Sequence, residues 1–207
     1  VEQAIELAQR LAPDTIALTG DFISDYVDEA EIEGALCGLY APDGVWGVMG
    51  NHDHWSGVEP LRVALSRTPV RELRNSHTRL EREGTAIVLA GVDDVWEGHA
   101  ALPQALNGID PDAPVILLAH EPDYADRAAT SGRVSLQLSG HTHGGEVRIP
   151  GINFPVLSHI LPHGRKYPAG LYRVGEMHLY TCRGIGQGWM PRIFCPPEVT
   201  EFTLIPG

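Results

Sequence analysis

The chain has 207 residues, and 43% of them are hydrophobic, which is enough to build the core of one compact domain. Its formal net charge of −12 argues against a nonspecific binder of nucleic acids or anionic membranes. Ten His beside 15 Lys and Arg direct attention to metal or acid–base chemistry. The three Cys form no CxxC pair, so we interpret them as free or buried thiols rather than disulfides or metal ligands.

The first residues predict a helix that has no capping residue ahead of it. Val1, Ala4, Ile5, Ala8 and Leu11 fall on one helical face. We therefore expect the chain to begin inside an element of a longer protein. The sequence contains neither an apolar stretch of about 18 residues nor a charged and then apolar leader, so we expect no membrane span or signal peptide within it. The sequence leaves the cellular compartment of the protein open.

The rest of the chain alternates short apolar runs with amphipathic segments, a pattern typical of a layered α/β domain. Several runs are continuous in Val, Ile and Leu, as in strands buried on both faces. From about Gly144 the helical signal fades, and we expect a mixed or antiparallel sheet region with long loops. No repeat or linker divides the chain, so residues 1–207 are expected to form one domain. The expected strands are 15–19, 45–49, 86–90, 115–119, 134–138, 170–174, 178–182 and 199–204, and the expected helices are 1–11, 28–39, 58–66 and 123–130.

Four of the apolar runs end in polar residues that can bind metals or move protons. Three of these endings contain a glycine, at Gly20, Gly50 and Gly140, which allows a sharp turn and a close approach to a ligand. Since the carboxyl ends of parallel strands meet at one edge of a sheet, we expect the four endings to share one site. They supply Asp21, then Asn51, His52 and Asp53, then His120, and then His141 and His143.

The residue types in this set indicate the chemistry. Carboxylate, amide and imidazole ligands suit Mn, Fe or Zn, whereas thiolates and an all-oxygen cage for Ca or Mg are not offered. Two such ions a few ångströms apart can bridge a hydroxide and clamp a phosphate. The ligand set is therefore suited to phosphoester hydrolysis by a metal-bridging hydroxide.

Four segments resemble, in order and spacing, the second to fifth motifs of calcineurin-like metallophosphoesterases. They read GDF, GNHDHW, HEPD and GHTHGGEVRIP. The later segments GRKYPAGLYRV, LYTCRGIGQG and FCPPEVTEFTL are similar to the YkuE-type branch, whose members are bacterial metal-dependent phosphodiesterases or phosphoesterases. The resemblance implies a four-layer αββα sandwich of two mixed sheets flanked by helices.

The resemblance also implies the metal ligands. Asp21 would bridge two divalent ions, and Asn51, His120 and His141 would complete one of the two metal sites. His143 would belong to the other.

Two further residues receive catalytic roles from the same resemblance. His52 would contact the scissile phosphate and assist the leaving oxygen, and Asp53 would fix the tautomer of His52. The alternative for Asp53 is a cap on the segment that follows it.

One family motif is not found in the sequence. Family members begin with a strand that ends in Asp-x-His, and this chain contains no Asp-x-His. The helix at Val1 matches the one that follows that strand, so we favour an incomplete sequence over evolutionary loss. We then expect one metal site with four protein ligands and a second with two, a missing first strand with an unpaired neighbour, and reduced activity of these 207 residues alone.

The remaining candidates lie outside the metal and catalytic assignments of the motifs. Trp55 is expected to pack in the core rather than to line the site, and Glu121 and Asp123 are expected to organise the loop that carries His120. Candidate contacts to a substrate phosphate are Arg165, Lys166 and Arg183. Surface or packing roles are expected for His54, His77, His99, His159, His163 and His178.

The function expected from the sequence is hydrolysis of a phosphodiester, a phosphomonoester or a lipid-linked pyrophosphate. Full-length members of the branch that this chain resembles often carry an amino-terminal membrane anchor or export signal, so membrane association through a segment before Val1 is a further expectation. The alternative is a metal-binding scaffold that has lost catalysis and binds a protein partner. The presence of His52 and Asp53, which add little to metal binding, argues against the scaffold.

Overall fold

The computed structural model describes residues 1–23, 26, 28–82, 84–148, 165–186, 188 and 191–205. Their strands form two sheets. The smaller sheet has the order β1-β2-β3, and both of its strand pairs are parallel. The resemblance implied two mixed sheets, but this one is parallel throughout its described strands because helices connect them. Its strands are β1 (Ile16–Leu18), β2 (Val45–Gly47) and β3 (Val70–Glu72).

The larger sheet is mixed, with the order β4-β5-β6-β7-β9-β8. Its four central strands run parallel, and an antiparallel partner lies at each edge. From the part of the chain after Gly144, only β8 and β9 join this sheet; β9 pairs parallel with β7 and antiparallel with β8, in line with the predicted mixed or antiparallel region. The strands are β4 (Ser76–Arg82), β5 (Thr85–Gly91), β6 (Val115–Leu118), β7 (Leu136–Ser139), β8 (Gly170–Val174) and β9 (Met177–Thr181).

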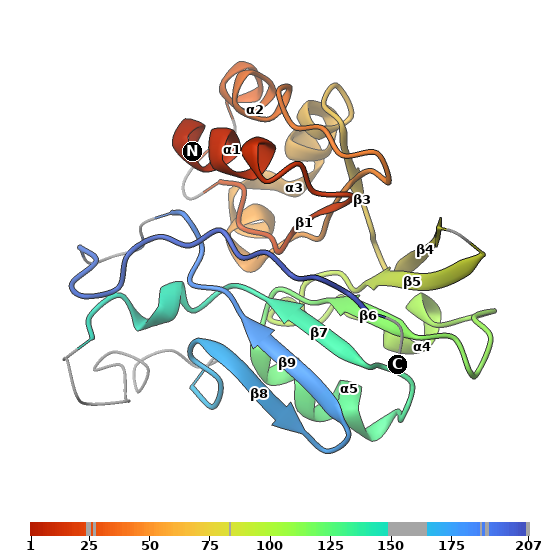
Figure 1. Ribbon diagram of the computed structural model, residues 1–207. Coiled ribbons are helices and arrows are strands. Elements are labelled where there is room, and N and C mark those ends of the chain that lie inside the picture. The colour runs from red at the N-terminus through yellow and green to blue at the C-terminus, as the bar shows by residue number, and fades with distance from the viewer. Residues whose placement is uncertain are drawn as a thin grey trace.

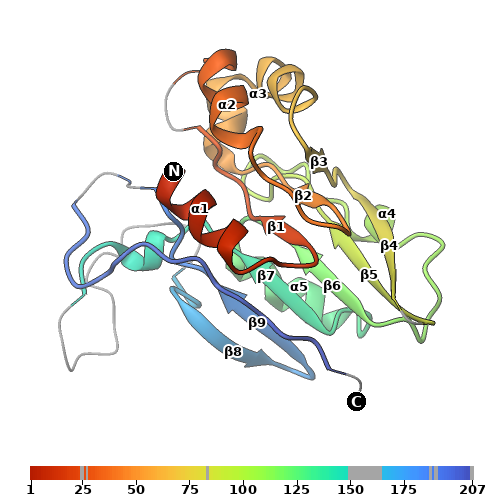
Figure 2. The ribbon, with the colours of Figure 1, turned by 45° about the horizontal axis from the view of Figure 1, so that its top comes forward.

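Helices cover the outer faces of the two sheets (Figures 1 and 2). One apolar cluster joins the smaller sheet to α1 (Glu2–Arg10), α2 (Glu29–Leu36) and α3 (Asn51–Leu65). Another joins the larger sheet to α4 (Leu102–Ala105) and α5 (Ala125–Thr130), the latter preceded by the 3-10 turn η1 (Pro122–Tyr124). A third cluster fills the space between the sheets, where Trp46 and Val48 meet Leu118. The result is an α/β fold that presses two sheets face to face.

Among the described residues, no helix combines the length and the apolar character that crossing a bilayer requires.

Helix α3 begins seven residues earlier than the apolar spacing predicts, at Asn51 rather than at 58. Its first turn is stabilised by Asp53, whose side chain accepts a hydrogen bond from the backbone N–H of Gly50, the residue before the helix. A kink at Gly57, with φ of 110°, separates this turn from the expected segment. Asn51, His52 and Asp53 of the GNHD segment therefore lie in the first turn of this helix, and Gly50 precedes it.

The strands β3 and β4, the helix α4 and the 3-10 turn η2 (His143–Gly145) escaped the sequence prediction, and one expected strand was wrong. β4 alternates exposed and half-buried residues at an edge, so it lacks an apolar run, while β3 and α4 are very short. Residues 199–204 form no strand. Side chains attach this segment to β9 instead: the Phe202 and Tyr180 rings meet edge to face, and Glu198 just ahead of it bonds to Tyr180.

Candidate metal centre

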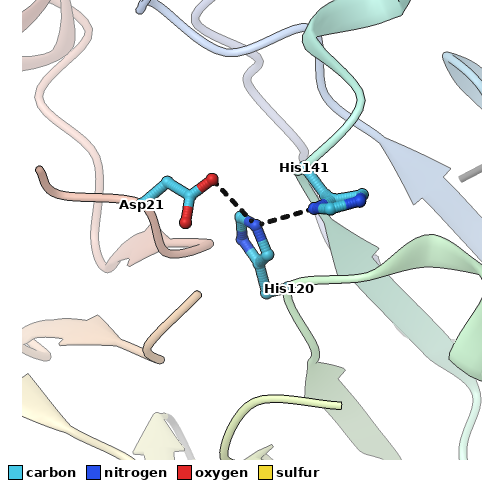
Figure 3. Close-up of side chains that lie close together, drawn as sticks. All are labelled: Asp21, His120 and His141. Carbon is cyan, nitrogen blue, oxygen red and sulfur yellow. Dashed lines mark hydrogen bonds and ion pairs between the residues drawn. The ribbon is translucent and has the colours of Figure 1, made fainter. Parts of the chain in front are cut away.

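The site lies where both sheets present their strand ends. Asp21 follows β1, Asn51 begins the helix after β2, His120 follows β6, and His141 follows β7. The smaller sheet thus supplies the two oxygen donors and the larger sheet the two imidazoles. Asp21, His120 and His141 point toward one another in Figure 3.

Short distances join these four side chains. His120 Nε2 lies 3.1 Å from Asp21 Oδ2 and 3.2 Å from His141 Nδ1. His141 Nδ1 in turn lies 3.0 Å from Asn51 Oδ1. One donor atom each from Asp21, His120 and His141 lie within 4.8 Å of one another, so these residues could hold a metal ion. The structure therefore brings together the four side chains that the sequence assigns to one metal site.

The orientation of His120 suits a metal ligand. Its ring is 1% exposed, and its Nδ1 lies 2.6 Å from the carbonyl oxygen of Thr19. A carbonyl can only accept, so Nδ1 carries a proton and Nε2 faces the other ligands. Metal-binding histidines are commonly held by such a bond on the second ring nitrogen.

The charges of Asp21 and His120 stabilise each other. Burial raises the pKa of Asp21, but the charge and hydrogen bond of His120 outweigh burial and bring this pKa down to about 2. Burial lowers the pKa of His120, and the same carboxylate raises it to about 10. Without a metal, a proton on Nε2 therefore bridges the pair. A divalent cation would meet the same negative charge, and mixed oxygen and imidazole donors fit Mn, Fe or Zn.

The backbone around the site adopts conformations that are unusual outside glycine. Asp21, His141 and His143 have φ values of 58°, 68° and 50°. Such left-handed residues cost free energy and persist where the surrounding structure holds them, often at functional sites. Two of the three glycines leave room for the His120 ring: a Cβ on Gly20 or Gly50 would lie 2.8 or 2.7 Å from it. Their predicted close approach to a ligand stays a prediction.

Asp53 connects the two oxygen-bearing loops of the smaller sheet. Its carboxylate is fully buried and accepts three backbone hydrogen bonds, from Asp21 N at 2.9 Å, Gly50 N at 2.9 Å and Ile23 N at 3.2 Å. All three donors precede Asp53 in the chain, so these bonds are not those of a cap on the segment that follows it, and that alternative was wrong. The assigned effect of Asp53 on the tautomer of His52 stays a prediction.

His52 occupies the rim of the site. Its backbone N–H donates to Asp21 Oδ1 over 3.0 Å, and its half-buried ring lies 5.0 Å, centroid to centroid, from Trp55. Trp55 is 52% exposed, so the expected core role of this tryptophan was wrong. The indole instead contacts the rings of His52 and Trp96 at the border of the site.

His143 is not a member of the Asp21–His120–His141 group, and it contacts an acidic residue that the sequence analysis did not single out. Its Nδ1 is 3.3 Å from Glu146 Oε1, and the same oxygen accepts a 2.7 Å hydrogen bond from Gly188 N. Burial lowers the pKa of His143, so its ring tends to be neutral. In the sequence, the signal for this contact was the spacing, because Glu146 follows His143 by three residues.

Two of the three candidate phosphate-binding cations are engaged with carboxylates. Lys166 pairs with Asp126 of α5 over 2.7 Å, and Arg183 pairs with Glu198. The side chain of Arg183 also passes close to Gly144, beside the His143 turn. No described contact joins Lys166 to the Asp21–His120–His141 group, and for Arg165, which is exposed, the assignment stays a prediction.

Glu121 joins the loop that carries it to a second loop. The buried carboxylate accepts hydrogen bonds from the backbone of Val95 at 3.2 Å and Trp96 at 3.1 Å. It thereby connects the loop of His120 to the loop after β5. Trp96 in turn places its ring 5.7 Å from that of His141.

The remaining histidines and the cysteines serve other purposes. His54 Nε2 pairs with Asp93 Oδ1 over 2.8 Å and its ring stacks on His99, while His77 Nδ1 meets the Ala105 carbonyl. His178 is exposed. These four histidines lie outside the candidate group, as expected, and His159 and His163 fall outside the described residues. The expectation of free thiols is confirmed for Cys37, Cys182 and Cys195.

Two facing sheets with a His and Asp cluster at their strand ends define an α/β protein with a candidate metal centre. Residues 1–145 match the family model of the calcineurin-like phosphoesterases, and the chain belongs to this family. The family expected from the motifs is confirmed.

Two relatives indicate which branch of the family the chain resembles. It is 35% identical over 198 residues to the uncharacterized metallophosphoesterase YkuE of Bacillus subtilis, covering 93% of this chain and 68% of that protein. It is 30% identical over 210 residues to the phosphodiesterase YaeI of Escherichia coli, covering 99% and 75%. The resemblance to the YkuE-type branch is thereby confirmed.

A solved structure supports the fold alone. The calcineurin-like phosphoesterase YfkN from Bacillus subtilis aligns with a TM-score of 0.52 at 13% sequence identity, over 88% of this chain and 72% of that chain.

Proposed function

We propose that the protein hydrolyses a phosphoester with the help of divalent metal ions held at the Asp21 cluster. The observation that carries this proposal is the convergence of Asp21, Asn51, His120 and His141 from both sheets within hydrogen-bonding distance. Membership of the calcineurin-like phosphoesterase family supports the reaction class. A phosphodiester, a phosphomonoester or a lipid-linked pyrophosphate could fill the substrate role, and the name of the YaeI relative favours the diester.

The four clustered side chains would hold one ion, and Asp21 with His143 would contribute to a second. Mn, Fe and Zn fit the mixture of oxygen and imidazole donors. When bound, such ions supply Lewis-acid chemistry, which activates water and neutralises phosphate charge. The residues that hold them belong to one domain, residues 1–207, in a four-layer sandwich of helices and two sheets.

The residues of this chain contribute orientation and proton transfer. His52 lies at the rim, next to Asp21, and would donate a proton to the leaving oxygen as its bond to phosphorus breaks. Asp53 would hold the loop of Asp21 against the first turn of α3, so that His52 and the metal ligands keep their relative positions.

Hydrolysis of bis-p-nitrophenyl phosphate with added Mn, Fe or Zn tests the proposal. We expect metal-dependent release of p-nitrophenol, and a roughly 100-fold or larger loss in His52→Ala with metal binding retained, since positioned proton donors contribute about 10²–10⁴. His178→Ala, an exposed histidine, is the matched control. A protein that binds metal and hydrolyses neither this diester nor p-nitrophenyl phosphate would be a scaffold. Unchanged turnover in His52→Ala would remove His52 from its role.

A further inference from the structure

A row of aromatic rings borders the candidate metal centre. The ring centroids of His52 and Trp55 are 5.0 Å apart, those of Trp55 and Trp96 are 5.3 Å apart, and those of Trp96 and His141 are 5.7 Å apart. The row therefore runs without a break from the proposed proton donor to a clustered imidazole. His141 closes it, 3.2 Å from His120.

Both tryptophans are anchored at one side. Trp55 Nε1 donates a 2.8 Å hydrogen bond to Glu97 Oε1, and the backbone N–H of Trp96 donates to Glu121 Oε1 over 3.1 Å. The planes of the two indoles meet at 87°, the edge-to-face arrangement that aromatic pairs favour. The bond to Glu97 keeps the Trp55 ring in one orientation, which lowers the entropy that a ligand must offset when it binds against this ring.

Core packing does not account for Trp55, because half of this large apolar side chain faces solvent. The exposed part of the Trp55 indole is a flat π surface at the border of the site, and such a surface accepts one flat ring. An acyl chain would need a longer apolar surface, whereas the groups next to Trp55 include a carboxylate, Glu97, and an imidazole, His52.

We propose that Trp55 and Trp96 form a subsite that stacks a flat aromatic group, a nucleobase or an aryl group, carried by the phosphoester. This inference rests on the proposed function for its location, since the phosphate would lie over the neighbouring Asp21–His120–His141 group. Aromatic side chains stack on flat rings through their π faces without needing specific hydrogen bonds. The subsite therefore selects substrates by the shape of the organic group.

Binding of AMP and of ribose 5-phosphate, measured by calorimetry with Mn present, tests the subsite without depending on turnover. The two probes share the phosphate and the sugar and differ in the adenine. We expect AMP to bind about tenfold more tightly, within the range for one stacked base. Trp55→Leu should bring the two affinities together while that for ribose 5-phosphate stays the same. Tyr40→Leu, which removes an exposed ring near the opposite ends of the strands, should keep the difference.

Phenyl, cyclohexyl and choline phosphates separate stacking from other kinds of contact. Stacking predicts that phenyl phosphate binds several times more tightly than the other two. Equal binding of phenyl and cyclohexyl phosphate would indicate general apolar contact, and a preference for choline phosphate would indicate a cation site; either would overturn the proposal. So would equal affinities for AMP and ribose 5-phosphate in the unaltered protein.

A second pair of variants tests the subsite even if Trp55→Leu does not fold. Glu97→Ala removes the acceptor of the Trp55 indole and should lower the preference for AMP, whereas Glu97→Gln keeps an acceptor oxygen and should retain it. Glu97 is exposed, so neither change disturbs the core. A preference for AMP in a protein that hydrolyses no phosphoester would support the subsite and contradict the proposed function.

Discussion

His120 Nε2 lies 3.1 Å from Asp21 Oδ2, although the two residues follow strands of different sheets. We predict that His120→Gln removes most metal binding at this site, because the amide cannot place a nitrogen lone pair at the same point. In the unaltered protein, metal at about 100 times its dissociation constant should add about 2.7 kcal/mol to the free energy of unfolding.

Thermal melts with and without Mn measure this effect. The exposed His178→Gln serves as the control and should keep the full shift. An equal shift in His120→Gln would show that the metal binds elsewhere.

Asp53 is predicted to stabilise the fold through the loop of Asp21. Asp53→Ala leaves the backbone N–H groups of Asp21, Ile23 and Gly50 without their acceptor. A buried donor left unsatisfied costs about 1–3 kcal/mol, so we expect a loss of about 3 kcal/mol or more. Urea unfolding provides the measurement, and Asp53→Asn, which keeps one acceptor oxygen, should lose less. Unchanged stability of Asp53→Ala would show that the three hydrogen bonds of Asp53 do not stabilise the fold. Only the proposed role of Asp53 at His52 would then remain.

Asp94 is predicted to make stability fall as the pH rises. Burial, with the Glu121 side chain adding to it, raises the pKa of Asp94 from 3.8 to about 7. The native protein therefore keeps this proton up to about pH 7, whereas the unfolded chain releases it above about 3.8. The contribution is complete below 3.8 and is lost as the pH rises through 7.

Asn cannot ionise. The free energy of unfolding of Asp94→Asn, relative to that of the unaltered protein, should therefore be higher at pH 8 than at pH 5.5. Melts at the two pH values measure the difference, and the exposed Asp112→Asn should show none. A difference that is the same at both pH values would show that Asp94 does not titrate between them.

Glu146 is predicted to position His143. Glu146→Ala removes the acceptor shared by His143 Nδ1 and Gly188 N, and partners of this kind commonly contribute about 10–100-fold to metal affinity or activity. We expect at least a tenfold loss of turnover at low metal concentration and partial recovery at high metal. Glu146→Gln keeps an acceptor oxygen and should retain most of the turnover. If the loss in Glu146→Ala does not respond to added metal, Glu146 acts on the fold rather than through His143.

The core strands of both sheets could be predicted from local pattern. Runs such as 115–119 are apolar throughout, because a strand covered on both faces has no polar side to display. β4 could not be found this way, since its edge position leaves alternate residues in water. Residues 199–204 show the reverse error: alternation suited a strand, but bonds from the side chains of Tyr180 and Thr200 to Glu198 hold this part of the chain.

By itself the sequence determined the family, through motifs that also assign Asp21, Asn51, His120 and His141 to one metal site. The strand-end pattern predicted a shared site at the edge of one sheet, whereas the cluster joins strand ends of two sheets. Only the tertiary structure decided which other groups meet that cluster. The contacts of Glu121 with the Trp96 loop, of Glu146 with His143, and of Trp55 with Trp96 join segments from different elements. No local spacing encodes a distance between separate loops, so the order of the motifs could not show the aromatic border of the site.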